Sequence, residues 1–520
     1  MAQIPEGQKI AGFFKSHAAW LCLAFLAFLT HFAFLNYPNQ VVFDEYYFSK
    51  FASRYFSHEY YFDIHPPLGK LMVAAAVKLA GYNPVSSDYG FFYIGEQFPS
   101  NLAFVLRFLP ALFGAFFVLL VYWLASLFSR SKEIAFLAGF LVLFDNAILV
   151  QSKFTLMDIF LLFFGVLTLC FFFLLQRKRR YSRGWFLFAL LTGVSFGLAI
   201  SIKWTGLAVI GVIFFALGLK SISRRFADFL GSPERAAGTL SAPVRSRFFS
   251  QVKEALIALV IILVVGILVY QIPFLIHFKL LDKPGGDDRM MSQRFLQTRA
   301  SAQFSPIGFW QNTWELNKKM LLASAGAVSD HPATSRWYQW PFDHMPVIYW
   351  SEIHKIRMFV GESAAIVLVG NPIIWLTALF AVLFTVFAIA WKKMRQNLRP
   401  VIYVLLFGYF ANLLPFVLIK RDSFLYHYLP ALIFADLLAA FWLEKLWHYN
   451  KKILLSLLIL ILLGFFFLAP LTYGWPLAND SVIQKAENNA LWLLSRGRIN
   501  FDPSFRPWIL PADIFKNSPK

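Results

Sequence analysis

The sequence is poor in cysteine and in charge. Its two cysteines, Cys22 and Cys170, both lie inside apolar blocks, so they provide neither a disulfide framework nor the spacing of a metal site. Charged residues make up only 15% of the 520 residues, whereas a soluble domain carries about 25%. Hydrophobic residues make up 58% and aromatic residues 19%. A soluble fold of this size could not bury so much apolar surface, and the composition therefore indicates a membrane protein.

Acidic residues are also scarce. The chain has 28 Asp and Glu residues against 48 Lys and Arg residues, which gives a net charge of +20. An excess of this kind is also found in proteins that bind nucleic acid. Here the basic residues cluster between the apolar blocks, as in the positive-inside pattern of membrane proteins. The sequence therefore predicts no nucleic-acid partner.

The apolar blocks are close to 20 residues long, which is the length that crosses about 30 Å of hydrocarbon. Backbone groups in lipid must be paired internally, so we expect the blocks to be helices. The pattern predicts an all-α polytopic membrane protein with eleven spans, near residues 17–36, 103–128, 134–150, 155–175, 185–201, 204–219, 254–277, 363–391, 400–419, 424–443 and 453–470. No small-residue cleavage site accompanies the first block, which we interpret as an uncleaved span.

Lys and Arg residues in the connections predict the orientation. One alternate set of short connections is strongly basic, with Arg130, Lys132, Arg177, Lys178, Arg179, Arg180, Arg183, Lys392, Lys393, Arg395, Arg399, Lys445, Lys451 and Lys452. This pattern predicts a cytoplasmic N-terminus and an external C-terminus. The organisation we expect is a transmembrane domain (1–471), two long outer loops (37–102 and 278–362), a cytoplasmic linker (220–253) and an extracytoplasmic tail (472–520).

The first outer loop contains two groups of polar residues. Asp44 and Glu45 follow the first span almost directly, near the membrane surface. A carboxylate there can accept a proton from a hydroxyl nucleophile or bind a divalent ion. The alternative is a solvated acidic pair at a helix end.

A rigid turn follows, because two prolines fix the backbone after Asp63-Ile64-His65. This turn is expected to present Asp63 and His65. Between the two groups, apolar residues recur at helical spacing and predict a short amphipathic helix in the interface, at Phe48, Phe51, Ala52, Tyr55 and Phe56.

The order of these motifs resembles the protein O-mannosyltransferase family of integral-membrane glycosyltransferases, which belong to the GT-C class. The matching segments are Asp-Glu after the first span, D-x-H-P-P-L-x-K, LRFLPALFG, LFDNAILVQSKFTLMDIFLLFF, SIKWTGL, DHPATSRWYQWP, GNPIIW and HYLPALIFADL. The resemblance implies a GT-C fold. It also implies that mannose passes from dolichyl or polyprenyl phosphate to Ser or Thr hydroxyls of an acceptor protein, on the extracytoplasmic side.

Two departures from the family pattern are visible. Eukaryotic members carry a large β-rich domain in the second outer loop, and the loop here has only about 85 residues. This is similar to prokaryotic members and implies a bacterial or archaeal plasma membrane. The family often has a base followed by proline after its W-P, where this chain has Met345 and Pro346. Eukaryotic relatives pair as dimers, which leaves a dimer open for this chain.

Few basic residues lie at the outer helix ends, and three of them are candidate ligands of the donor phosphate. They are Arg107, Lys203 and Arg421, because fixed cations stabilise the charge left on a departing phosphate. The alternative is that their side chains snorkel to lipid headgroups. His427 and Tyr428 are further candidates, with Tyr428 expected below Arg421 on one helix face and His427 slightly off that face. For His427 the alternative is a structural histidine whose hydrogen bonds are satisfied within the protein.

Asp158 is buried by its location in the fourth predicted span. Three interpretations remain open for its carboxylate: a pair with Lys153, a pair with Lys203, or a place in the pocket lining.

The resemblance implies a single inverting displacement with Asp44 as the general base, while Glu45, Asp63 and His65 order the loop and the acceptor. A divalent ion is not favoured, because the family does not imply one; Asp44 with Glu45, and Asp287 with Asp288, are the acidic pairs that could hold it. A divalent metal is therefore left open as a cofactor without being favoured, and no other cofactor is implied.

Three other functions compete with this interpretation. A transporter is disfavoured because no inverted repeat is visible, and a purely structural scaffold explains none of the motifs. A GT-C transferase acting on a lipid or polysaccharide acceptor remains the nearest alternative.

Overall fold

The computed structural model describes residues 6–82, 91, 93–99, 101–129, 131–222, 244–301, 303–326, 333–351, 364–391 and 399–476. The first half of this part contains α1 (Glu6–Phe32), α2 (Glu45–Ser57), α3 (Leu68–Leu79), α4 (Leu102–Phe128), α5 (Lys132–Leu143), α6 (Asn146–Lys153), α7 (Asp158–Gln176), α8 (Arg183–Ile202), the 3-10 turn η1 (Trp204–Leu207) and α9 (Ala208–Ile222). The second half contains α11 (Val244–Leu280), α12 (Gln293–Ala300), α13 (Pro306–Gly326), β1 (Val347–Ser351), β2 (Ala365–Leu368), α14 (Pro372–Ala390), α15 (Arg399–Leu413), α16 (Leu429–Tyr449) and α17 (Lys451–Tyr473).

The predicted helical membrane fold is confirmed. In the described part of the chain, eight helices are long and apolar enough to cross a membrane, and the bent pair α5 and α6 adds a ninth span. Two further predicted spans also coincide with helices, namely α1, whose apolar part Ala18–Phe32 is shorter, and α16, which is 21 residues long. The β1 and β2 strands form a small antiparallel sheet that the sequence did not predict.

Two predicted span boundaries are wrong. The span expected at 363–391 begins only at Pro372, because Asn371 caps α14 by accepting a hydrogen bond from the Ile373 N–H and because proline suits the first helical turn. The residues before it include strand β2. The span expected at 424–443 begins at Leu429, after a 3-10 turn (Leu425–Tyr428) that follows an extended Phe424.

The span expected at 134–150 is broken into α5 and α6, which meet at an angle of 62°. Asp145 causes the break because its side chain accepts a hydrogen bond from the Ile148 N–H at 3.0 Å and so starts a new helix. The Trp375 indole N–H of α14 donates to the other carboxylate oxygen at 2.6 Å. The break is therefore fixed by packing between distant helices.

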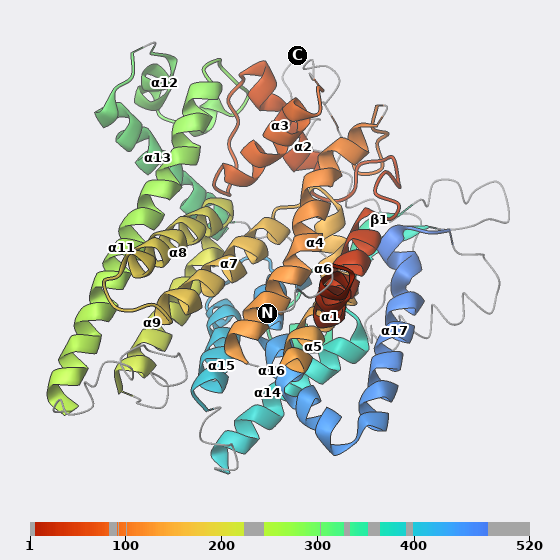
Figure 1. Ribbon diagram of the computed structural model, residues 1–520. Coiled ribbons are helices and arrows are strands. Elements are labelled where there is room, and N and C mark those ends of the chain that lie inside the picture. The colour runs from red at the N-terminus through yellow and green to blue at the C-terminus, as the bar shows by residue number, and fades with distance from the viewer. Residues whose placement is uncertain are drawn as a thin grey trace.

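Helices α2, α3 and α12 gather at one end of the helix bundle, beside the end of α11 (Figure 1). The first long loop (37–102) and much of the second long loop (278–362) thus meet at this end. Most of the predicted linker 220–253 and of the tail 472–520 lies outside the described residues, as do Asp330, His331 and Pro332 of the family-like stretch. The candidate site is built where these two loops meet the bundle.

Candidate active site

Helix α2 begins where the sequence predicted a short amphipathic helix. It buries Phe48, Ala52 and Tyr55 against the rest of the protein, while Phe51 and Phe56 are half-buried. Asp44 occupies the N-cap position, but its side chain makes no capping hydrogen bond. The helix therefore presents two adjacent carboxylates, Asp44 and Glu45, at its N-terminus.

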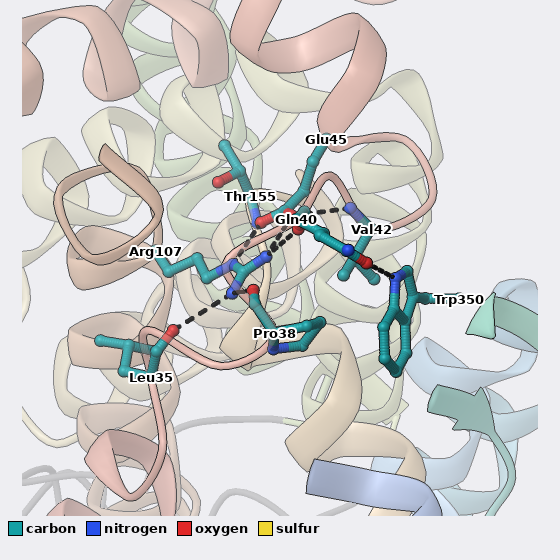
Figure 2. Close-up of polar contacts among 8 residues, drawn as sticks. All are labelled: Leu35, Pro38, Gln40, Val42, Glu45, Arg107, Thr155 and Trp350. Atoms are coloured by element: carbon teal, nitrogen blue, oxygen red, sulfur yellow. Dashed lines mark hydrogen bonds and ion pairs between the residues drawn. The ribbon is translucent and has the colours of Figure 1, made fainter. Parts of the chain in front are cut away.

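Glu45 is paired with Arg107 of α4, and Figure 2 shows the two side chains facing each other. Arg107 Nε donates to Glu45 Oε1 at 2.8 Å, and Arg107 Nη2 donates to Oε2 at 2.7 Å. Both side chains have no exposed surface. Glu45 also accepts hydrogen bonds from the backbone N–H groups of Val42 and Thr155, each at 3.0 Å. Both carboxylate oxygens are thus fully engaged inside the protein.

The remaining Arg107 donors hold the chain that leads from α1 to α2. They reach the carbonyl oxygens of Leu35 at 3.3 Å and of Pro38 and Gln40 at 2.8 Å. We predicted Arg107 as a ligand of the donor phosphate. The structure instead gives it five hydrogen bonds within the protein, so its geometry fits a residue that positions the Asp44 segment.

Asp44 differs from its neighbour because its carboxylate makes no hydrogen bond to any described residue. Burial raises the pKa of Asp44 to about 7; the charge of Lys203 lowers it, while those of Asp158 and Asp63 raise it. A carboxylate with this pKa is matched to general-base catalysis near neutral pH. It is also free to meet a substrate hydroxyl.

The Asp63–Pro67 turn is held by Lys70 of α3, which lies one helical turn after the prolines. Lys70 Nζ contacts Asp63 Oδ2 at 2.5 Å and donates to the His65 and Pro66 carbonyl oxygens at 2.7 Å. A small cavity lies against this turn, and its lining includes Asp63, His65, His277 and Met320. Asp63 and His65, which the sequence predicted to be presented by this turn, thus line a cavity.

His65 lies in a positive environment. Burial lowers its pKa well below the usual value, and the charges of Lys203, Lys70, Arg421 and His427 lower it further. The imidazole is therefore neutral at pH 7. It can donate or accept a hydrogen bond there, but it is poorly suited to hold a proton taken from a substrate.

Lys203 is the ion-pair partner of Asp158. Its Nζ lies 2.8 Å from both carboxylate oxygens of Asp158. Lys153 instead donates to the carbonyl oxygens of His31 and Ala33 and so caps the end of α1. Of the three interpretations that the sequence left open, the pair with Lys203 is the one that forms.

A chain of hydrogen bonds extends from this pair to strand β1. Gln151 Nε2 donates to Asp158 Oδ2 at 2.7 Å, and the Tyr349 hydroxyl donates to Gln151 Oε1 at 2.6 Å. Tyr349 stacks on Phe43 with 4.1 Å between ring centroids, and its carbonyl accepts from the Phe43 N–H. The second long loop therefore holds the residue next to Asp44.

Arg421 has no carboxylate partner among the described residues. Its Nη1 donates to Ser324 Oγ at 2.7 Å, and its Nη2 lies 3.5 Å from His427 Nε2. His427 Nδ1 lies 3.1 Å from both the N–H and the carbonyl oxygen of Phe424. Arg421 is thus the predicted cation whose charge remains available for an anion, and His427 positions it.

Tyr428 does not lie below Arg421, and that prediction is wrong because residues 421–424 are not helical. The Tyr428 side chain is buried, with its hydroxyl 3.4 Å from that of Tyr409 and its ring against Trp375. Its contacts are those of an interior residue, which gives no support for substrate binding.

The electrostatic interactions gather these groups into one cluster. Asp44 interacts with Lys203, and the pKa of Tyr426, raised chiefly by burial, responds to the charges of both Asp44 and Arg421. The cluster combines one free carboxylate with several cations whose charges also act on the neutral His65. Such a set can remove a proton from a hydroxyl and stabilise an anionic leaving group.

Three residues of this site were not singled out from the sequence: Lys70, Gln151 and Tyr349. Lys70 ends the D-x-H-P-P-L-x-K motif, so its position in the motif was the available signal. Gln151 and Tyr349 are separated by 198 residues in sequence, and no local pattern joins them.

No group of three or more His, Cys, Asp or Glu side chains in the described ranges is arranged to hold a metal ion. The second acidic pair has other partners. Asp287 accepts a hydrogen bond from the Phe62 N–H, and Asp288 lies 3.0 Å from the Arg299 guanidinium. The contact between Asp287 and Phe62 ties the second long loop to the first.

The arrangement of the helices is shared with solved membrane glycosyltransferases. The Saccharomyces cerevisiae protein O-mannosyltransferase Pmt1-Pmt2 complex bound to the sugar donor aligns with a TM-score of 0.76 at 19% identity, over 91% of this chain and 92% of that chain. An Archaeoglobus fulgidus oligosaccharyltransferase aligns with a TM-score of 0.51 at 14% identity, over 92% and 57%. These likenesses define the fold as that of a GT-C glycosyltransferase.

Family models identify the chain more closely. Residues 21–282 match the model of dolichyl-phosphate-mannose-protein mannosyltransferases, and residues 309–492 match the C-terminal four TMM region of protein-O-mannosyltransferase. The chain belongs to this protein O-mannosyltransferase family, as its sequence resemblance predicted. The first match contains Asp44 and Lys203, and the second contains Arg421.

Curated relatives agree with this assignment. Protein O-mannosyltransferase 1 of Drosophila melanogaster is 34% identical over 52% of this chain and 29% of its own length. Dolichyl-phosphate-mannose--protein mannosyltransferase 3 of Saccharomyces cerevisiae is 34% identical over 52% and 33%. The chain thus spans about a third of the length of these relatives.

Proposed function

We propose that this protein transfers mannose from a polyprenyl (dolichyl) phosphate carrier to Ser or Thr hydroxyls of proteins, with inversion at the anomeric carbon. The single observation that carries the proposal is the free Asp44 carboxylate, whose pKa is about 7. The carboxylate of the adjacent Glu45 is instead held in an ion pair with Arg107. Family membership supplies the donor and acceptor classes, since the relatives are named for dolichyl-phosphate-mannose and protein.

In the proposed reaction the acceptor oxygen attacks the anomeric carbon while Asp44 takes its proton. The bond between that carbon and the phosphate oxygen breaks, and its electron pair stays on the oxygen as polyprenyl phosphate. Arg421 stabilises this anion because no described carboxylate neutralises it, whereas Lys203 shares its charge with Asp158. Asp63 and His65 contact the acceptor from the cavity beside them.

We further propose that the reaction takes place on the extracytoplasmic side of a prokaryotic plasma membrane. The charge pattern of the connections supports this side, and the second long loop is short compared with that of eukaryotic members. The Pmt1-Pmt2 complex of yeast supports a dimeric assembly as part of the same proposal.

The test is transfer of radiolabelled mannose from polyprenyl phosphate to a panel of Ser/Thr peptides, with mass spectrometry of the product. Asp44→Asn should lower turnover by about 10²–10⁴-fold, the usual contribution of a general base. Glu133→Gln, on an exposed side chain next to Ser131 at the start of α5, is the matched control and should leave turnover unchanged.

Near-normal turnover by folded Asp44→Asn would refute the assignment of the base. Label that enters a lipid or polysaccharide, with none in any peptide, would instead assign the alternative acceptor class.

A further inference from the structure

Helix α13 exposes an apolar stripe although it belongs to a loop. Ile307 is 72% exposed, Trp310 52%, Trp314 75% and Leu321 57%. These residues are three, four and seven positions apart, so they lie on one face of the helix. Large exposed apolar faces of this kind mark contact with lipid or protein.

The opposite face of α13 belongs to the candidate site. Asn312, Thr313, Leu316 and Met320 are buried, and Leu316 and Met320 line the cavity that also contacts His65. Ser324, near the end of the helix, accepts the hydrogen bond from Arg421. The helix thus stands between the cavity and the surroundings of the protein.

Two contacts place α13 alongside a spanning helix. Phe309 packs on Phe278 with 6.2 Å between ring centroids, and Tyr270 donates a hydrogen bond to Asn317 at 2.5 Å. Phe278 and Tyr270 are eight residues apart in α11, and their partners Phe309 and Asn317 are eight residues apart in α13, in the reverse order. The two helices therefore run antiparallel to each other for about 12 Å. Figure 1 shows α13 beside α11 at the end of the bundle that carries α12.

The contact between Tyr270 and Asn317 lies well inside the length of α11. Tyr270 is ten residues before Leu280, the last residue of α11, which corresponds to about 15 Å along the axis of α11 from its end. At these levels α11 itself exposes Leu268, Ile272 and Ile276, and α11 is one of the helices apolar enough to cross a membrane. The exposed stripe of α13 therefore continues the exposed apolar surface of a transmembrane helix.

We propose that α13 dips into the leaflet on the side of the candidate site and forms a wall between lipid and the cavity. Its stripe contacts lipid, with Trp310 and Trp314 at the level where tryptophan concentrates in membrane proteins, the boundary between headgroups and acyl chains. Lys318 lies on the same face and is exposed. Its long side chain reaches toward the headgroups, as lysines near a membrane surface do.

The test uses spin labels on the full chain in phosphatidylcholine–phosphatidylglycerol vesicles, after replacement of Cys22 and Cys170. Labels are placed at Trp314→Cys and, as a second site, at Trp310→Cys. Collisions with oxygen, which concentrates in lipid, are compared with collisions with a water-soluble nickel chelate. Val264→Cys on the exposed side of α11 provides the lipid reference, and Gln297→Cys on the exposed side of α12 provides the water reference.

Both α13 labels should show an oxygen-to-nickel collision ratio close to that of Val264→Cys and several-fold above that of Gln297→Cys. A ratio equal to the Gln297→Cys value would place the stripe in water and overturn the proposal. An immobilised label with few collisions with either reagent would also overturn it, because the stripe would then be buried against protein, such as a second copy of the chain. Neither readout depends on mannosyl transfer.

Discussion

The pKa of Asp44 predicts the pH dependence of the proposed reaction. A carboxylate with a pKa of about 7 is roughly one-tenth ionised at pH 6 and roughly nine-tenths ionised at pH 8. Because only the ionised form can accept the acceptor's proton, kcat/KM should rise about tenfold between these two pH values. The activity is thus lost as the pH falls through about 7, far above the range in which an unperturbed aspartate titrates.

Substitution of Lys203 tests whether Asp44 is the group whose pKa sets this pH dependence. Its charge lowers the pKa of Asp44, whereas the charge of Asp158 raises it. Lys203→Met removes the cation and leaves Asp158 without its ion pair, so both effects shift the rising limb of the profile to higher pH. Lys78→Met, which removes an exposed lysine of α3, should leave the limb in place.

The assay is kcat/KM for a Ser peptide without ionisable side chains, measured from pH 5.5 to pH 8.5. The donor is a phosphodiester and does not titrate in this range, so the limb reports on the enzyme. His65 cannot supply the limb, because burial and the neighbouring cations hold its pKa well below the usual value. A flat profile, or a shift of the Lys203→Met limb to lower pH, would refute the reasoning.

Three further predictions concern the residues around this base. Arg107→Lys keeps the charge but has fewer donors than the five hydrogen bonds of Arg107 require, so it should destabilise the protein by about 3 kcal/mol, measured by thermal unfolding in detergent; an unchanged Tm with a raised donor KM would instead favour phosphate binding. Asp44→Asn should raise Tm, and by more at pH 8 than at pH 5, because the buried carboxylate destabilises the folded protein when it is ionised, and it is ionised at pH 8 but not at pH 5; a lower Tm would contradict this. Tyr349→Phe loses its hydrogen bond to Gln151 and should lower kcat/KM several-fold while the peptide KM stays constant; unchanged kinetics would show that the network is dispensable.

The spans could be predicted from the sequence because a transmembrane helix must be both long and apolar. Their ends were harder, because apolar residues also occur in strands and turns. The β2 strand reads as apolar sequence, so it was taken into the following span even though Asn371 and Pro372 carry a helix-start signal. The break at Asp145 depends on Trp375, which lies 230 residues away, and no local pattern contains that information.

The candidate site was predictable in its residue types but not in its pairings. Asp44 and Glu45 are adjacent, and neither composition nor spacing tells which of them is free. The partner of Glu45 lies 62 residues further along the chain, and the choice of Lys203 over Lys153 for Asp158 also depends on the packed helices. Arg107 was therefore assigned to the substrate although the protein uses its whole guanidinium.

The two adjacent carboxylates depend on each other. Burial is the largest cause of the raised pKa of Asp44, and the chain segment that buries it is held by Arg107 through Glu45 and three carbonyl groups. A looser anchor that admits water to Asp44 should lower its pKa, because hydration favours the charged form. Arg107→Lys should therefore shift the rising limb of the pH profile to lower pH, whereas Lys203→Met shifts it to higher pH. An unchanged limb in Arg107→Lys, with the limb of Lys203→Met shifted, would mean that charge alone, and not desolvation, sets the pKa of Asp44.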